Sequence, residues 1–265
     1  MPGTEIDRIE PTRRPRDLQV LWMNWRDLLF LHWPVPAESL QPMIPPELEV
    51  DTFQGSAYVG LVPFTMKGVR PIGLPPVRGL SNFHETNVRT YVHHRGRDPG
   101  VWFFSLDAAH PLAVTLARRT YHLPYHLARM FLEHDPPNVA KPSSPILYSG
   151  VRVSPNPRPA SYLIRALANG TPHPATPGTL EHFLIERYIL YAQARDHLYL
   201  GRVHHQPYPV QAARVETLDE TLLAAAEIHR PNLPPIAHFA RGVDVRIYAI
   251  RKVDESDLSD PPTAS

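Results

Sequence analysis

The sequence predicts an α+β fold built mainly from antiparallel strands, and three observations favour it. The 32 prolines are spread along the 265 residues and interrupt the chain before long helices can form. Several segments alternate apolar and polar residues with the period of two that is typical of strands. The glycine patterns GxGxxG and GxxxxGK[ST] of nucleotide-binding α/β proteins are absent. Short strands with a few short helices between them argue against a doubly wound parallel sheet.

The expected elements follow from local composition and spacing. Apolar or alternating runs predict strands at 28–33, 57–65, 87–93, 101–106, 146–153, 161–166, 188–192, 197–205 and 243–250. Helical spacing of apolar residues predicts helices at 36–48, 107–119, 125–133, 180–187 and 221–229. Pro124 suits the first turn of the helix at 125–133. In the last strand, Val243, Val245, Ile247 and Ala249 are expected to face inward.

Length and composition predict one domain. The chain is 43% hydrophobic and long enough for a sizeable core, which we place at residues 18–253. Residues 1–17 and 254–265 are polar and rich in proline or charge, so they are expected to be loose tails. No secretory h-region and no apolar run of ~20 residues is present, so a cytoplasmic location is the default expectation.

Charge and cysteine content exclude several classes of protein. Lys+Arg 27 against Asp+Glu 26 gives a formal charge of +1, which predicts no nucleic-acid partner and no membrane partner. The absence of cysteine excludes disulfides, thiolate nucleophiles and Cys-ligated zinc. The lysines are Lys67, Lys141 and Lys252 alone, so amine chemistry has few candidates.

The first candidate site is the segment 83–91. If it is extended, Glu85, Asn87, Arg89 and Tyr91 share one face, because side chains alternate along a strand. In a pocket, Arg89 can bind a carboxylate and Glu85 can move a proton, with Asn87 and Tyr91 as further binding groups. The alternative is a solvated strand face whose charges pair with one another.

The second candidate site is Ala-Arg-Arg-Thr-Tyr-His-Leu-Pro-Tyr-His-Leu-Ala at 117–128. It resembles the stretch of acetoacetate decarboxylases in which Phe-Pro-Lys-Lys-Leu-Ala carries the Schiff-base lysine and the neighbour that lowers its pKa. Aligned on Pro124, the two lysine positions fall on Tyr125 and His126, and neither has a primary amine. The resemblance therefore implies no imine chemistry here. The phenol and the imidazole can exchange protons with a ligand, or they can simply pack at the start of a helix.

Over residues 18–252 the chain resembles the uncharacterised YqjF-like bacterial family, domain of unknown function 2071, of the acetoacetate decarboxylase-like superfamily. The matching stretches are 28–34, 57–64, 83–92, 101–108, 123–130, 178–188 and 204–208. The resemblance implies a cone-shaped, mainly antiparallel β-barrel with peripheral helices, an internal cavity and assembly into a homo-oligomer. It supplies no assigned catalytic residues.

Other chemistries have weaker signals. The 15 histidines include adjacent pairs, which point to opposite faces of a strand, and HExxH is absent, so we expect no metal and no cofactor. A GxSxG elbow is also absent. Glu181, Glu186 and Arg187 can reach a cavity, but a paired surface is the favoured interpretation. The large aromatic residues are expected to be core or barrel lining: Trp25, Trp33, Trp102 and Phe103.

Two functions fit these residues. The first is a protein that binds a small organic acid or carbonyl compound without a Schiff-base lysine. The alternative is an acid–base lyase or isomerase in which Arg89 holds a carboxylate, Glu85 is the acid or base, and Tyr125 or His126 donates a proton. A polar pocket with close acid–base pairs favours the enzyme, and an apolar cavity favours the binding protein.

Overall fold

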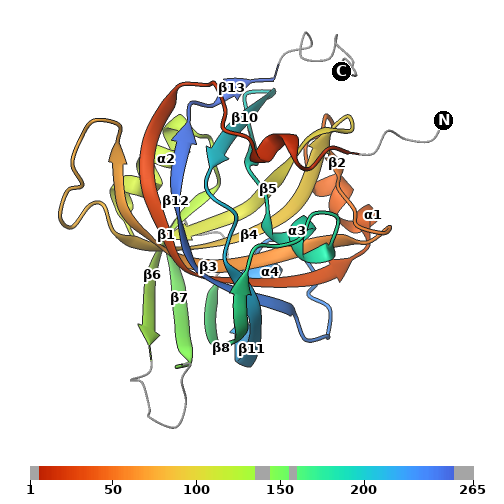
Figure 1. Cartoon of the computed structure of the whole chain (residues 1–265), viewed down its shortest axis with the longest axis vertical. Coiled ribbons are helices and arrows are strands. Elements are labelled where there is room, and N and C mark those ends of the chain that lie inside the picture. The colour runs from red at the N-terminus through yellow and green to blue at the C-terminus, as the bar shows by residue number, and fades with distance from the viewer. Residues whose placement is uncertain (1–5, 135–143, 155–159, 254–265) are drawn as a thin grey trace.

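The computed structural model describes residues 6–134, 144–154 and 160–253 (Figure 1). The strands are β1 Gln19–Val35, β2 Glu49–Val50, β3 Ala57–Pro71, β4 Phe83–His94, β5 Arg97–Ala108, β6 Tyr125–His134, β7 Ile146–Ser154, β8 Ser161–His173, β9 Ile189–Ala194, β10 His197–His204, β11 Val210–Glu220, β12 Ile236–Tyr248 and β13 Arg251–Lys252. The helices are α1 Ala37–Leu40, α2 Pro111–Thr120, α3 Leu180–Ile185 and α4 Leu222–Ala225, with 3-10 turns at Glu10–Thr12 and Gln41–Met43. The predicted mainly antiparallel α+β fold is confirmed.

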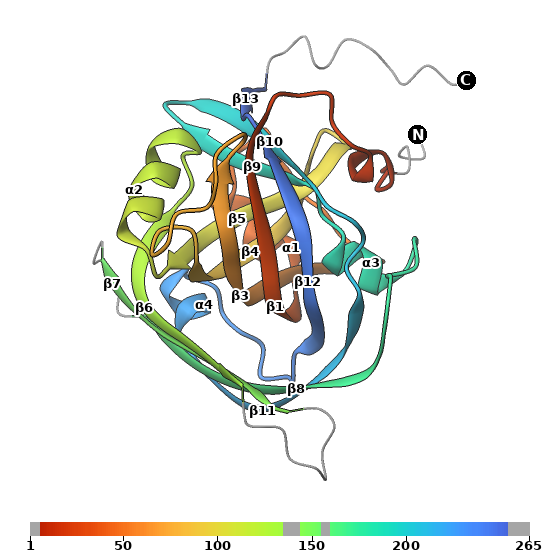
Figure 2. The ribbon, with the colours of Figure 1, turned by 60° about the vertical axis from the view of Figure 1, so that its left-hand side comes forward.

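The strands close two hydrogen-bonded rings that share one wall. In the described chain the inner ring runs β1-β3-β4-β5-β9-β10-β12 and back to β1. The outer ring keeps the shared wall of β12, β1, β3, β4 and β5 and closes through β6, β7, β8 and β11. Figure 2 shows the strands β6, β7, β8 and β11 as a layer on one side of that wall. Among the described pairings only β5–β6 and β5–β9 are parallel.

The shared wall has two apolar faces because side chains alternate along each strand. In β1, Phe30 belongs to the core inside the inner ring, whereas Leu31 belongs to the core between the wall and the outer layer. In β3, Val62 and Leu61 divide between the two cores in the same way. Burial on both faces explains the continuous apolar run from Leu28 to Trp33.

The predicted helix at 125–133 is wrong, because this segment is strand β6. Tyr125 pairs with Leu106 of β5, and residues 127–134 pair with β7. The residues Leu-Ala-Arg-Met have high helix propensity, but this pairing overrides it. Side chains alternate along β6, so Tyr125 points into the inner ring while Ala128 packs in the other core.

Several other boundaries differ from the expectation. The strand expected at 28–33 is part of the longer β1, and β11 is a strand that the sequence analysis missed. The helix expected at 36–48 is shorter in the structure and consists of α1 followed by a 3-10 turn. The helix expected at 221–229 is also shorter and corresponds to α4. The predicted α2 is confirmed, with the His110 side chain accepting a hydrogen bond from the Ala113 amide. No helix in the described ranges has the length and apolar character needed to cross a bilayer.

The structure describes residues 6–17 of the first predicted tail and none of the second. Residues 6–17 include a 3-10 turn with Pro11 buried, and the Arg8 side chain bonds Asp51 of the domain. This part of the N-terminal segment is therefore attached to the domain surface. Residues 254–265 lie outside the described residues.

Candidate ligand-binding site

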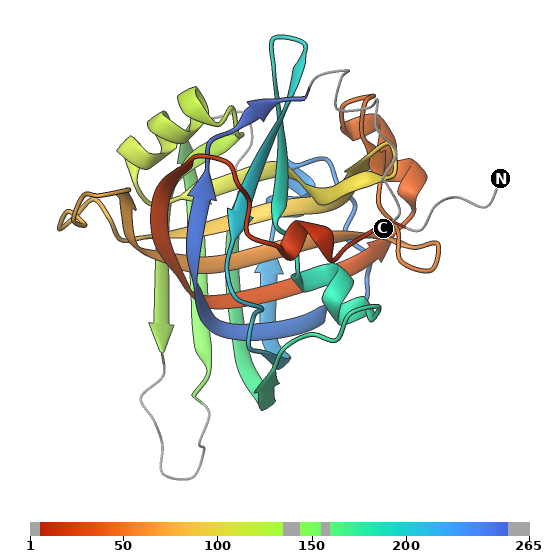
Figure 3. The ribbon, with the colours of Figure 1, turned by 45° about the horizontal axis from the view of Figure 1, so that its top comes forward.

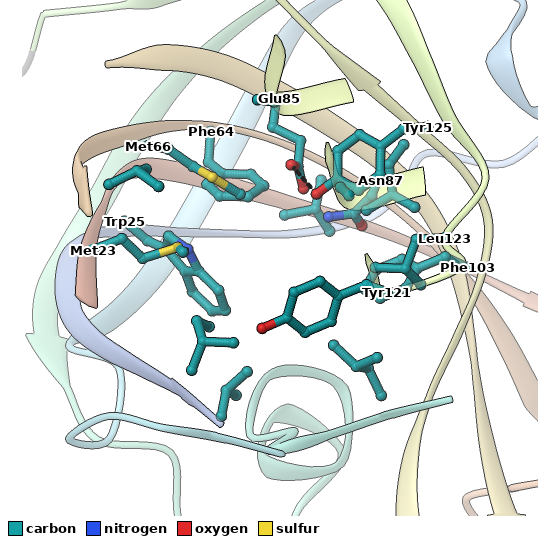
Figure 4. A pocket seen from close by; sticks show the side chains of 18 of the residues that line it. Met23, Trp25, Phe64, Met66, Glu85, Asn87, Phe103, Tyr121, Leu123 and Tyr125 are labelled. Atoms are coloured by element: carbon teal, nitrogen blue, oxygen red, sulfur yellow. Dashed lines mark hydrogen bonds between the residues drawn. The ribbon is translucent and has the colours of Figure 1, made fainter. Parts of the chain in front are cut away.

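The inner ring surrounds a cavity of about 190 Å³. All seven strands of that ring contribute lining side chains, and α2 contributes others. Most of the lining is apolar, including Trp25, Phe64, Met66, Phe103, Leu190 and Ile247. Polar side chains from β4 and the start of β6 lie close together along one part of the lining (Figure 4). The predicted role of Trp25 and Phe103 as barrel lining is confirmed.

Strand β4 supplies the polar row that the sequence predicts. Glu85, Asn87 and Arg89 all line the cavity and are 2%, 5% and 9% exposed. The alternative of a solvated strand face is therefore wrong. Tyr91 shares this face and lies in the same core, but it does not line the cavity.

Glu85 and Tyr125 form a buried acid pair in the cavity wall. The Tyr125 hydroxyl donates to Oε2 of Glu85 at 2.7 Å (Figure 4). Burial raises the pKa of Glu85 to about 8, although the hydrogen bonds from Tyr125 and Asn87 lower it. Burial and the neighbouring Glu85 charge hold the pKa of Tyr125 well above its ordinary value. At neutral pH the carboxyl group is mostly protonated and can donate a hydrogen bond.

Arg89 brings a positive charge to the same cavity. Its Nη2 donates to the Leu184 carbonyl oxygen at 3.2 Å, and its guanidinium lies 5.7 Å from the ring centroids of Phe30 and Tyr91. Its Nε is buried without a hydrogen-bond partner, and no carboxylate in the described chain forms an ion pair with it. A buried guanidinium and a neutral carboxyl group in the same lining leave the cavity with net positive charge, which favours an anionic ligand.

Tyr91 supports Arg89 from behind the cavity. The Tyr91 hydroxyl donates to the Leu184 carbonyl at 2.7 Å, which is the carbonyl that Arg89 also uses. The Nε2 of His32 lies 2.7 Å from the same hydroxyl. Burial lowers the pKa of His32 well below its ordinary value, so the imidazole is neutral and its Nε2–H donates to Tyr91. Tyr91 is therefore placed to hold Arg89 rather than to touch a ligand.

His126 does not reach the cavity. It pairs with Asp107 of β5, directly beside the pair of Leu106 and Tyr125. Neighbouring residues of a strand point to opposite faces, so the inward position of Tyr125 turns His126 away. Of the four groups in the predicted acid–base mechanism, Glu85, Arg89 and Tyr125 line the cavity and His126 does not.

The favoured surface interpretation of Arg187 is wrong. Its Nη1 bonds Oδ2 of Asp51 at 3.0 Å, and both side chains are buried. Its guanidinium also lies over the Tyr91 ring, 4.8 Å from the centroid. Glu181, in contrast, is partly exposed and pairs with His173 at 3.0 Å.

The surface interpretation is also wrong for Glu186, which holds a cavity residue in place. Its carboxylate accepts from the Tyr188 hydroxyl at 2.6 Å and from the Tyr208 amide at 2.9 Å. Burial raises the pKa of Glu186. Tyr208 lines the cavity, and His205 lies between Tyr188 and Tyr208 with ring centroids 4.4 Å and 4.5 Å away.

Sequence reasoning missed Tyr208. The residue lies in a Pro-Tyr-Pro loop between β10 and β11, where no strand or helix period indicates which way a side chain points. Its only signal was its place in the stretch 204–208 that matches the YqjF-like family. The charge of Arg89 acts on the Tyr208 phenol, although burial dominates and keeps its pKa well above the ordinary value.

The described lysines do not line this cavity. Lys67 and Lys252 are exposed, and neither is among the lining residues. Lys141 lies outside the described residues. The phenol of Tyr125 occupies the lining position at which the sequence comparison with the decarboxylases placed a lysine.

The fold and the internal cavity define the class of protein: this is an acetoacetate decarboxylase-like fold. An enduracididine biosynthesis enzyme, MppR, with HEPES buffer bound superposes with a TM-score of 0.62 at 12% identity, covering 89% of this chain and 88% of that one. An acetoacetate decarboxylase-like enzyme from Sphingomonas wittichii RW1 gives 0.59 at 11% identity, with 89% and 93% covered. An acetoacetate decarboxylase from Legionella pneumophila gives 0.59 at 12% identity, with 89% and 88% covered.

The family follows from sequence. The model of the DUF2071 family, described as an uncharacterized conserved protein, matches residues 22–244. The uncharacterized protein YqjF of Bacillus subtilis (strain 168) is 37% identical over 238 residues, which is 90% of this chain and 94% of YqjF. The chain therefore belongs to the DUF2071 family.

Proposed function

We propose that this protein binds a small organic acid, a monocarboxylate with an apolar body, inside the inner ring. The observation that carries the proposal is the buried guanidinium of Arg89, which shares the cavity lining with a neutral Glu85 and has no ion-pair partner in the described chain. Arg89 would bind the carboxylate, and the Glu85 carboxyl and the Tyr208 phenol would donate further hydrogen bonds. The ligand charge would then replace the missing counter-ion.

The size and lining of the cavity narrow the ligand further. The volume of about 190 Å³ is below the ~300–1,000 Å³ of ordinary ligand pockets, so a small molecule is expected. Its body would lie against apolar side chains such as Trp25, Phe64 and Met66. The solved relatives include MppR complexed with pyruvate, a small keto acid, which supports the ligand class by analogy of fold alone.

A thermal-shift panel tests this proposal. Straight-chain and aromatic monocarboxylates of increasing size would be compared with their methyl esters, which have the same body without the charge. A ligand that binds only the folded state should raise the melting temperature by several degrees at a concentration ~100-fold above its Kd. We expect a shift with at least one acid and none with its ester.

Arg89→Gln is the decisive variant, because it removes the charge and keeps a polar side chain. The shift should disappear in Arg89→Gln and persist in Arg202→Gln, a change in a partly exposed arginine that pairs with Asp98 outside the cavity. Equal shifts for acids and esters, or an undiminished shift in Arg89→Gln, would show that the anion-binding role is wrong.

A second candidate function is acid–base catalysis on the bound acid, and the Glu85–Tyr125 pair favours it. A carboxyl group with a pKa of about 8 can both donate and accept a proton near neutral pH. Incubating the protein in D₂O with keto acids that bind would reveal this activity as deuterium incorporation at the carbon beside the carbonyl, followed by NMR. Incorporation that Glu85→Gln abolishes supports an enzyme, whereas binding without incorporation supports the binding protein.

A further inference from the structure

The cavity reaches the surface beside α2 and the first residues of β1. Leu116 of α2 lines the cavity and is 60% exposed, while Leu21 and Val69 are half-buried lining residues. The apolar lining therefore continues to the outside of the molecule at this point.

Exposed apolar side chains surround this opening. They come from the start of β1, from the connection between β3 and β4, and from α2: Leu18, Ile72, Leu74, Val77, Leu80, Leu112 and Leu116. We call this set the mouth surface. Each is between 45% and 74% exposed, and a clustered set of exposed apolar side chains marks an interaction site.

The three segments of the mouth surface are neighbours in space. The Ile72 amide donates to the Val20 carbonyl, which joins the β3–β4 connection to β1. The Phe83 ring lies 5.7 Å from the ring of His110, the residue that caps α2. In Figures 1, 2 and 3 the connection and α2 lie next to each other on the same side of the molecule.

Positive charge accompanies these apolar side chains. From Asp51 to Glu85 the chain has no acidic residue between the ends, and the same holds from Asp107 to Glu133. Three cations of the first stretch lie at the end of β3 and in the connection between β3 and β4, which carries part of the mouth surface: Lys67, Arg70 and Arg78. Across residues 6–134, 144–154 and 160–253 none of these three forms an ion pair. A chain with a formal charge of only +1 thus has a local cationic excess at the cavity opening.

We propose that the mouth surface docks on an anionic lipid surface. Exposed leucine, isoleucine and valine side chains insert at the level of the headgroups, and nearby Lys and Arg side chains are attracted to anionic lipids. This departs from the expectation of no membrane partner, which rested on total charge and did not consider its distribution. A second copy of the chain fits less well, because two cationic surfaces would face each other. The docking needs no ligand in the cavity.

Cosedimentation with vesicles tests the proposal. The full chain would be mixed with vesicles of equimolar phosphatidylcholine and phosphatidylglycerol, or of phosphatidylcholine alone. We expect binding to the anionic vesicles only, and weaker binding as salt rises toward 1 M, where the Debye length is about 3 Å.

Three double variants distinguish docking through the mouth surface from nonspecific electrostatic attraction to the vesicles. Leu74→Ser with Leu112→Ser removes two apolar side chains of the mouth surface that do not line the cavity, and should reduce vesicle affinity at least ~10-fold. Val151→Ser with Leu163→Ser removes two exposed apolar residues from the outer layer and should leave affinity unchanged. Lys67→Gln with Arg78→Gln removes two cations of the mouth surface and should weaken binding to anionic vesicles while keeping every apolar side chain.

Three results would overturn the proposal. The first is no binding of the wild type to anionic vesicles. The second is equal loss of binding in the mouth-surface pair and the outer-layer pair, with both proteins folded by their thermal melts. The third is a dimer in solution that Leu74→Ser with Leu112→Ser dissociates, because a second copy would then cover the mouth surface.

Discussion

Glu85 combines two properties that a surface carboxylate does not have. It is buried among apolar side chains, and it is hydrogen-bonded by a phenol rather than by a cation. Burial outweighs the hydrogen bonds, so the pKa rises to about 8. The residue therefore changes charge near neutral pH, which makes both ligand affinity and stability depend on pH.

The pH dependence of stability should differ between the wild type and Glu85→Gln. Because the pKa of Glu85 is higher in the folded state, that state binds the proton more tightly, and wild-type stability falls as pH rises from about 4.5 to about 8. The amide of Gln cannot ionise, so over this range the wild type should lose about 3–5 kcal/mol of unfolding free energy relative to the variant. Urea unfolding of both proteins at several pH values measures the difference. Glu38→Gln, at an exposed site, provides the control, and parallel curves for wild type and Glu85→Gln would contradict the prediction.

Ligand binding should depend on the same proton. Above a pH of about 8 the Glu85 carboxyl group would be ionised, so the cavity would lose its net positive charge and the carboxylate would repel an anionic ligand. The affinity for a carboxylate identified by the thermal-shift panel should therefore fall as pH rises through this value.

At the scale of elements, the contact between β5 and β9 determines where the inner ring closes. Only two residue pairs join these parallel strands, Val101 with Leu190 and Trp102 with Tyr191. Gly100 lies at the start of this contact, where an added Cβ would come within 2.7 Å of the Ile189 carbonyl oxygen. Backbone on the opposite strand cannot move aside as a side chain can.

Gly100→Ala should therefore destabilise the fold by about 1–3 kcal/mol. Gly201→Ala, in β10, provides a matched control, because its Cβ would meet only the side chains of Leu190 and Ile250, at 3.1 Å and 3.2 Å. Urea unfolding should show a clearly smaller loss for Gly201→Ala. Equal losses of unfolding free energy in the two variants would mean that the close backbone contact between β5 and β9 does not constrain the ring.

Strand β6 shows how one element serves two cores. Its first residue, Tyr125, enters the inner ring, and on the opposite face of the strand Met130 packs in the outer core. A helix at this position would not allow the parallel pairing with β5. The pairing thus decides that Tyr125 and not His126 belongs to the cavity.

Across the whole molecule, a buried ion pair links the shared wall to the outer layer. The Nε of Arg152 in β7 donates a hydrogen bond to Oδ1 of Asp107 in β5 at 3.0 Å, its Nη2 lies 2.8 Å from the same oxygen, and both side chains are almost fully buried. Burial raises the pKa of Asp107, although Arg152 lowers it. Removing one partner would leave the other group in the core without compensation.

Arg152→Met should therefore cost about 3–5 kcal/mol of unfolding free energy. Asp107→Leu with Arg152→Met removes both charges and should be less damaging than Arg152→Met alone, since no unpaired charge remains. Urea unfolding of the wild type, Arg152→Met and the double variant measures their order of stability. A double variant that is less stable than Arg152→Met would show that the pair does more than neutralise two buried charges.

The sequence alone determined the main class of fold and the face of β4 that carries the polar row. Period-two alternation predicted that Glu85, Asn87 and Arg89 point the same way, because this depends only on local backbone geometry. Resemblance to a family added the closed, cone-shaped arrangement and the site around Tyr125, but not the direction in which Tyr125 or His126 points.

Only the tertiary structure decided which groups meet in the cavity. The helix propensity of residues 125–133 yielded to strand pairing, Tyr208 entered from a loop without a period, and Glu186 and Arg187 became buried through contacts with Tyr208 and Asp51. Each outcome depends on contacts between segments far apart in sequence. A local pattern reports propensity and the alternation of faces, whereas burial, and with it the raised pKa of Glu85, exists only after the ring has closed.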